Sequence, residues 1–302
     1  MGEATFCPVC RRWSAGLAAG PDGRPNAACV TCHSLERHRV AALLIPQLVS
    51  RTAGAGMVLD IAPYSVLSRF LKETFGSQLV GLDLDPAVDG RSIDLQADIT
   101  RLPLPSDSID VVYCSHVLEH VPDDSAAMRE IARVLHPSGL AYIQVPRRKG
   151  AVTEEDVSAS SQERLERFGQ TDHVRIYGDD FESRLRDGGL SVATTTIASI
   201  LPKHLIRLVG AKPTEELWLA AVNRDPTELL SSEALLQGLE LRTPTMAGRR
   251  LSELIAERDE ALSEATHWHE SYLQLRDQFP VRTLLRLKRL IGGTGKEPRD
   301  FV

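Results

Sequence analysis

The chain has 302 residues, a length that fits one core domain with smaller additions. Its formal net charge of −6 argues against a general nucleic-acid-binding protein, because such proteins usually present a basic surface. No segment approaches the roughly 18 uncharged apolar residues of a membrane-spanning helix, and this excludes an ordinary integral membrane protein.

The N-terminal segment contains two Cys-x-x-Cys pairs, Cys7 with Cys10 and Cys29 with Cys32. Each pair can place two thiolates on one ion, and the two pairs complete the tetrahedron that zinc prefers. Four thiolates leave no position for water, so we expect a structural Zn²⁺ site in a zinc ribbon. His33 is the alternative ligand if one cysteine does not bind.

The compartment is indicated by the cysteines and by the first residues of the chain. The chain has five cysteines, an odd number, and four of them fall into the metal-binding pattern. The first residues show neither a basic region nor an apolar region of the kind found in signal peptides. We therefore expect a cytoplasmic protein in a reducing compartment.

Helices and strands are predicted to alternate from residue 35 to residue 222. The predicted helices are 35–50, with Ser34 as N-cap, 65–75, 124–135 and 181–186. The predicted strands are 57–61, 78–84, 109–114, 140–145 after the turn Pro137-Ser138-Gly139, 190–197 and 217–222. This alternation favours an α/β fold with a mostly parallel sheet, which binds ligands at the carboxyl ends of its strands.

Five segments along these elements carry a family resemblance: VLDIAP at 58–63, VGLDLDP at 80–86, ADITRLP at 97–103, IDVVYCSHVLEHV at 109–121 and RVLHPSG at 133–139. In this order and spacing they resemble the motifs of class I methyltransferases that use S-adenosylmethionine (SAM), of the methyltransferase type 11 group. The resemblance implies a Rossmann-like methyltransferase sheet and SAM as the methyl donor.

The resemblance assigns six residues to the cofactor: Asp60, Ala62, Asp83, Asp98, Ile99 and Ser115. A carboxylate at the end of the second strand can accept two hydrogen bonds from a ribose diol, the role expected of Asp83 or, alternatively, of Asp85. Asp98 would accept from the adenine amino group, with Ile99 at its apolar edge. The alternative for Asp98 is a turn residue.

The first motif departs from the family pattern, because Ala62-Pro63-Tyr64 stands where a glycine-rich loop is usual. Pro63 has no N–H to offer. SAM is then held differently, or held weakly, or no longer bound. The last case predicts a non-catalytic scaffold.

Methyl transfer to a hydroxyl needs a base near the carboxyl ends of the fourth and fifth strands. His116, Glu119 and His120 follow the fourth strand and could supply that base or hold a divalent metal. The alternative is that Glu119 belongs to a helix start of this fold.

The segment FGQTDHVRIYG at 168–178 suits a lid over the acceptor. Within it, His173 is the first choice of catalytic base, with Asp172 beside it and His116 as a further catalytic candidate. Arg175 would bind an anionic group of the acceptor. The alternative is a set of solvated loop residues.

The alternation of predicted strands and helices ends before residue 225. A heptad pattern over 251–279 predicts a coiled coil that forms a homo-oligomer or docks on a partner, although Arg258 at a core position would weaken a simple dimer. The alternative is an amphipathic helix that packs on its own domain. The basic amphipathic stretch 281–291 predicts peripheral contact with the inner face of a membrane, or binding to a partner.

We therefore predict five parts: a zinc ribbon at 1–34, a SAM-dependent methyltransferase domain at 35–224, a linker at 225–248, a coiled-coil helix at 249–280 and a basic amphipathic tail at 281–302.

The coiled coil with its basic tail resembles the ends of bacterial enzymes that act on cell-surface glycans. The expected acceptor is a hydroxyl of a bacterial surface glycan or glycolipid precursor. An alternative is an rRNA or tRNA methyltransferase whose ribbon grips RNA, but the acidic charge and thin basic patch of the ribbon count against nucleic acid.

Overall fold

A computed structural model describes residues 4–21, 23–85 and 93–230 of the chain. The chain divides into two compact units, residues 1–243 and 244–302, and all the described residues belong to the first. The predicted coiled coil at 249–280 and the tail at 281–302 lie outside the described residues. The division into five parts stays a prediction.

A seven-stranded sheet forms the centre of the first unit. Its strands are β5 (Val58–Ile61), β6 (Leu79–Asp83), β7 (Leu95–Gln96), β8 (Ile109–Ser115), β9 (Leu135–Gln144), β12 (Ser191–Thr196) and β13 (Glu216–Ala221). They lie in the order β12-β13-β9-β8-β5-β6-β7. The five strands from β9 to β7 are parallel, and β13 is antiparallel to both of its neighbours. The sheet is therefore a doubly wound α/β sheet that ends in an antiparallel pair.

The order of the strands reverses at β5. The chain runs from β5 outward to β6 and β7, and then returns to the other side of β5 as β8. A crevice opens at such a switch point, outside the carboxyl ends of the two strands, and ligands of doubly wound sheets bind there. In this chain the switch point lies between the ends of β5 and β8.

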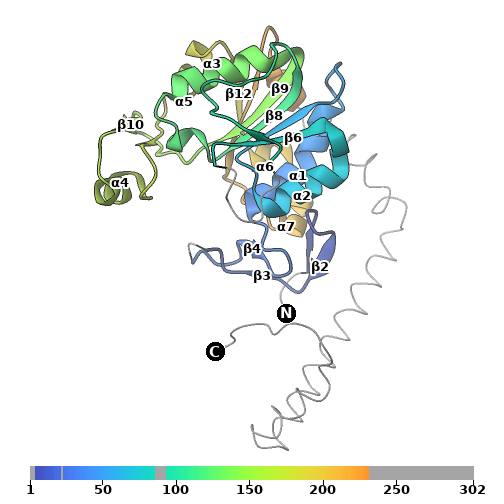
Figure 1. The fold of residues 1–302 in the computed structure, drawn as a ribbon. Helices are drawn as coiled ribbons and strands as arrows, with labels where there is room; N and C mark the ends of the chain where they lie inside the picture. The colour runs from blue at the N-terminus through green and yellow to red at the C-terminus, as the bar shows by residue number, and fades with distance from the viewer. Residues whose placement is uncertain (1–3, 22, 86–92, 231–302) are drawn as a thin grey trace, which may run out of the picture. The chain divides into compact units, whose positions relative to one another are not determined.

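Helices cover both faces of the sheet (Figure 1). One face packs against α1 (Glu36–Val49), α2 (Ser65–Phe75), α6 (Ile197–Ile200) and α7 (Lys203–Val209), and the other against α3 (Asp124–Val134) and α5 (Phe181–Asp187). Successive residues of β8 face opposite sides, so Val111 and Tyr113 pack with the first group and Val112 and Cys114 with the second. The described residues also include three short 3₁₀ helices: η1 (Gly76–Gln78), η2 (Leu118–His120) and η3 (Pro226–Leu230).

Most predicted boundaries lie within one residue of the observed ones, and two differences have a clear physical reason. Leu35 rather than Ser34 is the N-cap of α1, and its N–H donates to Nδ1 of His38 at 3.1 Å. β9 begins at Leu135 instead of residue 140, because Leu135 pairs with Ile109 before the predicted turn bulges out of the strand. Gly139 fits this bulge because a Cβ there would lie 2.9 Å from the carbonyl oxygen of Ile109.

Two smaller parts are attached to the sheet. The N-terminal module consists of two hairpins, β1 (Thr5–Cys7) with β2 (Arg12–Ser14) and β3 (Leu17–Ala18) with β4 (Ala28–Cys29). Between β9 and α5, β10 (Glu154–Glu155), α4 (Ser161–Phe168) and β11 (Arg175–Ile176) form a projection, of which β10 and α4 stand clear of the sheet (Figure 1). None of the described helices is long and apolar enough to cross a membrane.

Candidate functional site

The four cysteines of the N-terminal module form one cluster. The Sγ atoms lie 3.6 Å apart for Cys7 and Cys32 and 3.8 Å apart for Cys10 and Cys29, and all four lie within 4.8 Å of one another. Zinc bound tetrahedrally at about 2.3 Å from each sulfur places the sulfurs about 3.8 Å apart. The cluster therefore fits a Zn²⁺ ion.

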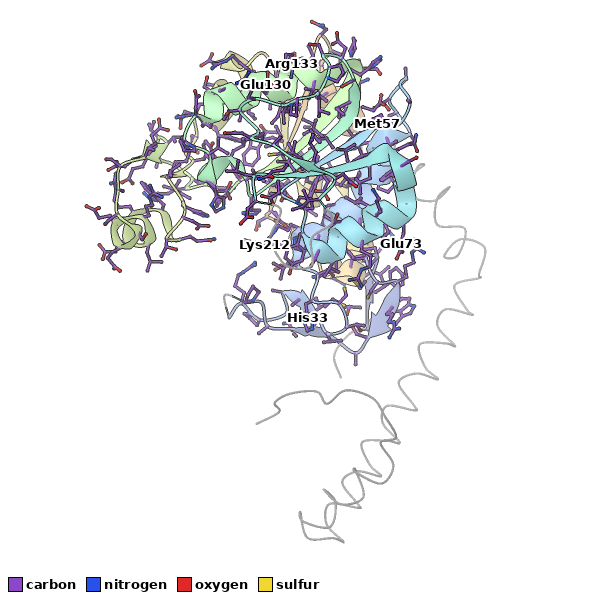
Figure 2. All side chains as sticks on the ribbon, viewed as in Figure 1. His33, Met57, Glu73, Glu130, Arg133 and Lys212 are labelled. Carbon is purple, nitrogen blue, oxygen red and sulfur yellow. The ribbon has the colours of Figure 1, made fainter. Side chains whose placement is uncertain are left out.

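Two matching turns shape this cluster. The N–H of Arg11 donates to the carbonyl of Cys7, and the N–H of His33 donates to the carbonyl of Cys29, at 2.8 and 2.9 Å. Arg11 and His33 each follow the second cysteine of a pair, and both have positive φ, 57° and 59°. The backbone therefore forms the same type of turn at each of the two cysteine pairs. His33, labelled in Figure 2, is not part of the four-residue metal cluster of the module.

Arg39 joins the module to the methyltransferase-like sheet. It is buried in α1, and its guanidinium donates to the carbonyls of Ala27 and Ser34 in the module and of Val209 and Gly210 after α7. A buried cation needs such partners, because an unpaired charge away from water is very costly. Arg39 therefore links the module to both α1 and the end of α7, in addition to the apolar packing of Cys7, Val9 and Cys29 against these helices.

The residues predicted to bind SAM come together at the carboxyl edge of the sheet. β5 pairs Ile61 with Leu82 of β6 and Cys114 of β8, so the next residues, Ala62, Asp83 and Ser115, stand side by side across three strands. The N–H of Ala97 donates to the carbonyl of Asp83, which brings the segment with Asp98 and Ile99 to the same edge. Asp60 is buried within β5. These assignments stay predictions.

Two details bear on how this edge would hold a cofactor. Ala62 has a φ of 52°, the left-handed conformation that glycine usually supplies, so the chain makes the turn after β5 without a glycine. Oδ1 of Asp98 accepts from the N–H and hydroxyl of Thr100, both at 2.8 Å. These are the hydrogen bonds expected if Asp98 is a turn residue, the alternative to a residue that binds adenine.

The loop that follows Asp98 is held by α3. Glu130 accepts from the N–H of Leu102 at 2.7 Å, and Arg133 donates to the carbonyls of Leu102 and Leu104 at 2.9 Å. Figure 2 labels Glu130 and Arg133. Arg133 and Glu130 also pair with each other. Arg133, the first residue of the segment RVLHPSG, therefore holds the loop after Asp98 in place.

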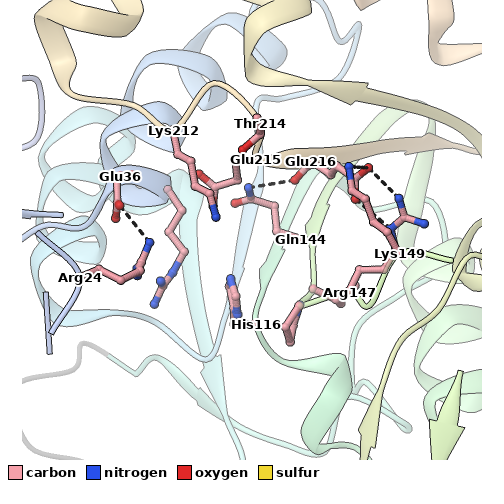
Figure 3. A pocket seen from close by; sticks show the side chains of 13 residues that line it. Arg24, Glu36, His116, Gln144, Arg147, Lys149, Lys212, Thr214, Glu215 and Glu216 are labelled. Atoms are coloured by element: carbon pink, nitrogen blue, oxygen red, sulfur yellow. Dashed lines mark hydrogen bonds and ion pairs between the residues drawn. The ribbon is translucent and has the colours of Figure 1, made fainter. Parts of the chain in front are cut away.

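A cavity of about 450 Å³ opens beside this edge (Figure 3). It is lined by residues from the module, the start of α1, the ends of β8 and β9 and the start of β13: Arg24, Glu36, Arg37, His116, Gln144, Val145, Pro146, Arg147, Lys149, Lys212, Thr214, Glu215 and Glu216. His116 has a positive φ of 58° directly after β8, and Figure 3 shows its ring pointing into the cavity. The cavity therefore adjoins the switch point of the sheet.

The walls of the cavity carry more positive than negative side chains. Glu216 pairs with Arg147 at 2.7 Å and with Lys149 at 3.0 Å. Arg37 and Lys212 have no carboxylate within ion-pair distance among the residues that the structure describes. These two cations are available to an anionic ligand.

Glu215 is a half-buried carboxyl group in the wall of the cavity. Burial raises the pKa of Glu215 above its ordinary value, and the nearby His116 and Arg37 oppose this effect. A carboxylate whose pKa is raised takes up a proton more readily than an ordinary carboxylate. The sequence analysis missed this residue because it stands in no recognisable motif.

The structure places the other predicted catalytic residues beside the cavity rather than in its wall. His173 is 3% exposed and donates from Nδ1 to the carbonyl of Phe168 at 3.1 Å. Asp172 is an exposed residue whose carboxylate lies 3.2 Å from Nδ1 of His120. No residue of 168–178 lines the cavity described above. The assignment of His173 as base stays a prediction, and His116 has the better position.

Arg175 does not have the expected role. It is buried, and its guanidinium donates to the carbonyls of Leu118, Val121 and Pro122 and pairs with Glu155 at 3.1 Å. The donors that would bind an acceptor are therefore used to hold the chain around η2. The expectation that Arg175 binds an anionic acceptor is wrong for this reason.

Comparison with known proteins identifies the central part of the chain. Residues 59–143 match the family described as "Methyltransferase domain". A probable S-adenosylmethionine-dependent methyltransferase of Mycobacterium tuberculosis is 46% identical over 54 residues, 18% of this chain and 20% of that protein. The 27-O-demethylrifamycin SV methyltransferase of Amycolatopsis mediterranei is 36% identical over 107 residues, 34% of this chain and 37% of that protein. The chain thus spans between a fifth and two fifths of the length of these curated relatives.

Among solved structures, an S-adenosylmethionine-dependent methyltransferase from Mesorhizobium loti aligns with a TM-score of 0.42 and 17% identity, over 60% of this chain and 96% of that one. The strand order and the family match together define a class I methyltransferase fold. Residues 59–143 match the methyltransferase domain family, and the matched Mycobacterium tuberculosis relative is a probable S-adenosylmethionine-dependent methyltransferase.

Proposed function

We propose that the protein transfers the methyl group of SAM to a hydroxyl of an acceptor that also carries an anionic group. A phosphorylated or acidic sugar of a bacterial surface glycan or glycolipid precursor has this chemistry. The observation that carries the proposal is the cavity next to the cofactor edge, where His116 stands among unpaired cations. The Amycolatopsis relative is a 27-O-demethylrifamycin SV methyltransferase, and this supports an oxygen acceptor.

In the proposed reaction the acceptor oxygen attacks the methyl carbon of the sulfonium. The new C–O bond forms as the C–S bond breaks, and S-adenosylhomocysteine leaves. The hydroxyl proton passes to Nε2 or Nδ1 of His116, or to Glu215 on the opposite wall. Arg37 and Lys212 hold the anionic group, and this fixes the distance between the two reacting atoms.

The cofactor is tested first, by calorimetric titration of SAM into the zinc-loaded protein. We expect saturable binding that Asp83→Ala abolishes and Asp85→Ala preserves, because only Asp83 stands level with Ala62 and Ser115. No binding by the wild type would instead favour the scaffold interpretation of the Ala62-Pro63 loop.

The acceptor is then tested with matched sugars that differ only in a phosphate or carboxylate group. Arg37→Gln and Lys212→Gln should each raise KM for the anionic sugar and leave the affinity for SAM unchanged. A charged hydrogen bond contributes about 1.5–3 kcal/mol, which corresponds to a roughly 10- to 150-fold change. Equal methylation of the neutral sugar would contradict the proposal.

A further inference from the structure

We propose that Glu119, His120 and His173 bind a divalent transition-metal ion of the zinc type, at a second site separate from the cysteine cluster. One ligand atom of each residue lies within 4.8 Å of the others. Glu119 and His120 belong to η2, whereas His173 comes from the chain that enters β11, more than 50 positions later. Two imidazoles and one carboxylate form a donor set that holds Zn²⁺ in catalytic sites and Fe²⁺ in others.

The buried atoms of this cluster lack ordinary partners. Glu119 is 0% exposed, and neither carboxylate oxygen accepts a hydrogen bond from any residue that the structure describes. Nδ1 of His116 approaches Oε1 to 3.3 Å, without the geometry of a hydrogen bond. Nε2 of His173 is likewise buried with no hydrogen-bond partner in the described part of the chain. A buried carboxylate in this state is costly, and a bound cation removes the cost.

The two imidazoles are oriented as metal ligands are. Nδ1 of His173 donates to the carbonyl of Phe168, and Nδ1 of His120 lies against the carboxylate of Asp172. Metal-binding histidines almost always use the second nitrogen in this way, which fixes the ring and leaves Nε2 for the ion.

The backbone around the cluster is fastened on both sides. Arg175 binds the carbonyls of Leu118 and Pro122 at 2.9 Å, on either side of Glu119 and His120. The N–H of Val174 donates to the carbonyl of Glu119, also at 2.9 Å. The segment with His173 is therefore tied directly to η2, so the three ligands keep their spacing before an ion arrives.

The cluster has one accessible side. The side chains of His120 and His116 are 34% and 32% exposed, whereas Glu119 and His173 are buried. His116 also lines the cavity proposed for the acceptor, so an ion bound by Glu119 would adjoin that cavity. An open coordination position there could take a water molecule or an acceptor oxygen.

The test is a count of metal ions in the full-length protein, by elemental analysis after equilibration with Zn²⁺ and removal of loosely bound ions. We expect two Zn²⁺ per chain in the wild type and one in His120→Ala and in His173→Ala. His33→Ala, beside the cysteines, is the matched control and should keep two. His120 is half-exposed, so its variant remains informative even if His173→Ala fails to fold.

A second measurement separates this site from the ribbon. Titration with Co²⁺ should fill one site with sulfur-to-cobalt absorption and one without it, and His120→Ala should lose only the second. Asp172→Asn should weaken the second site about 10- to 100-fold, the usual effect of removing an outer-sphere partner. One ion per chain in the wild type, or a second ion that survives in His120→Ala, would overturn the proposal. Neither result depends on methyl transfer.

Discussion

His116 combines three features in one residue. It directly follows β8 at the switch point of the sheet, it has a left-handed backbone, and its ring points into the cavity. A non-glycine residue is held in that conformation only when its surroundings impose it, and such residues cluster at functional sites.

We predict that His116→Ala lowers kcat about 10²- to 10⁴-fold and leaves the affinity for SAM unchanged, because a general base contributes a factor of this size. His136→Ala is the control, since His136 lies in the bulge of β9 and contacts Ser138. An unchanged kcat in His116→Ala, together with a lowered kcat in Glu215→Gln, would assign the proton to Glu215.

His38 makes the stability of the fold depend on pH. Burial lowers the pKa of His38 to about 2, with smaller contributions from Arg37 and other nearby charges. Its Nδ1 accepts from the N–H of Leu35, and its ring stacks on Tyr64 at 4.1 Å. The folded protein therefore keeps this imidazole neutral at pH values where the unfolded chain protonates it.

The direction in which stability changes with pH follows from the lowered pKa of His38 in the folded protein. The contribution of His38 to stability is fully present above about pH 6.5 and is lost as the pH falls, by about 1.4 kcal/mol per pH unit. Glutamine suits the same position near a helix start and can still accept from Leu35. The free energy of unfolding of His38→Gln, measured in urea between pH 7.5 and 5, should fall less steeply than that of the wild type. Parallel curves would contradict the assignment.

At the scale of elements, the sequence predicts the sheet well because its strands are short apolar runs between clear turn signals. α2 begins and ends at the predicted residues. β9 was predicted too short, since Pro137 and Gly139 signal a turn whether it ends a strand or bulges from one. α4 was not predicted, although Ser160 and Glu163 form a capping box at its start, because the helix is polar and buries only Phe168.

The sequence predicts a part of the candidate site only where the residues that form it are close together along the chain. The four cysteines fall into two pairs along the chain, so their cluster can be read from the sequence. The cavity cannot, because Arg24, His116 and Lys212 come from three distant segments. The pairing of Glu119 with His173 depends likewise on how the chain from β9 to α5 folds back on η2.

Arg39 should be the most sensitive residue of α1. Replacing it with methionine removes a donor from four carbonyls, one of which, that of Ser34, still accepts from the N–H of Cys29. Each buried carbonyl left without a donor costs about 1–3 kcal/mol. We expect Arg39→Met to lower the free energy of unfolding by at least about 3 kcal/mol. Arg37→Met, two positions earlier, should change it by less than about 1 kcal/mol, since that side chain faces the cavity. Similar losses in the two variants would contradict this role of Arg39.

At the scale of the whole molecule, the proposed acceptor places the reaction at a membrane, where lipid-linked glycan precursors are found. The stretch 281–291, outside the described residues, alternates basic and apolar side chains. We propose that it holds the protein on an anionic surface, and that 251–279 joins two copies of the chain. Each basic residue near such a surface contributes about 1 kcal/mol.

Deleting residues 281–302 should release the protein from vesicles that contain anionic lipid, in a flotation assay at low salt. Binding of the full-length chain should weaken as salt rises, because the attraction is screened. Vesicles of neutral lipid provide the control. A full-length protein that never floats with anionic vesicles would show that the tail has another partner.

Arg39 also affects the order in which the protein can fold during its synthesis. Its carbonyl partners lie 12 and 5 positions away on one side and 170 and 171 positions away on the other. The ribosome releases the N-terminus first, so the guanidinium has only its two nearby partners until residue 210 has left the exit tunnel. The ribbon is therefore synthesised before the domain, and its attachment through Val209 and Gly210 can form only after these residues have emerged.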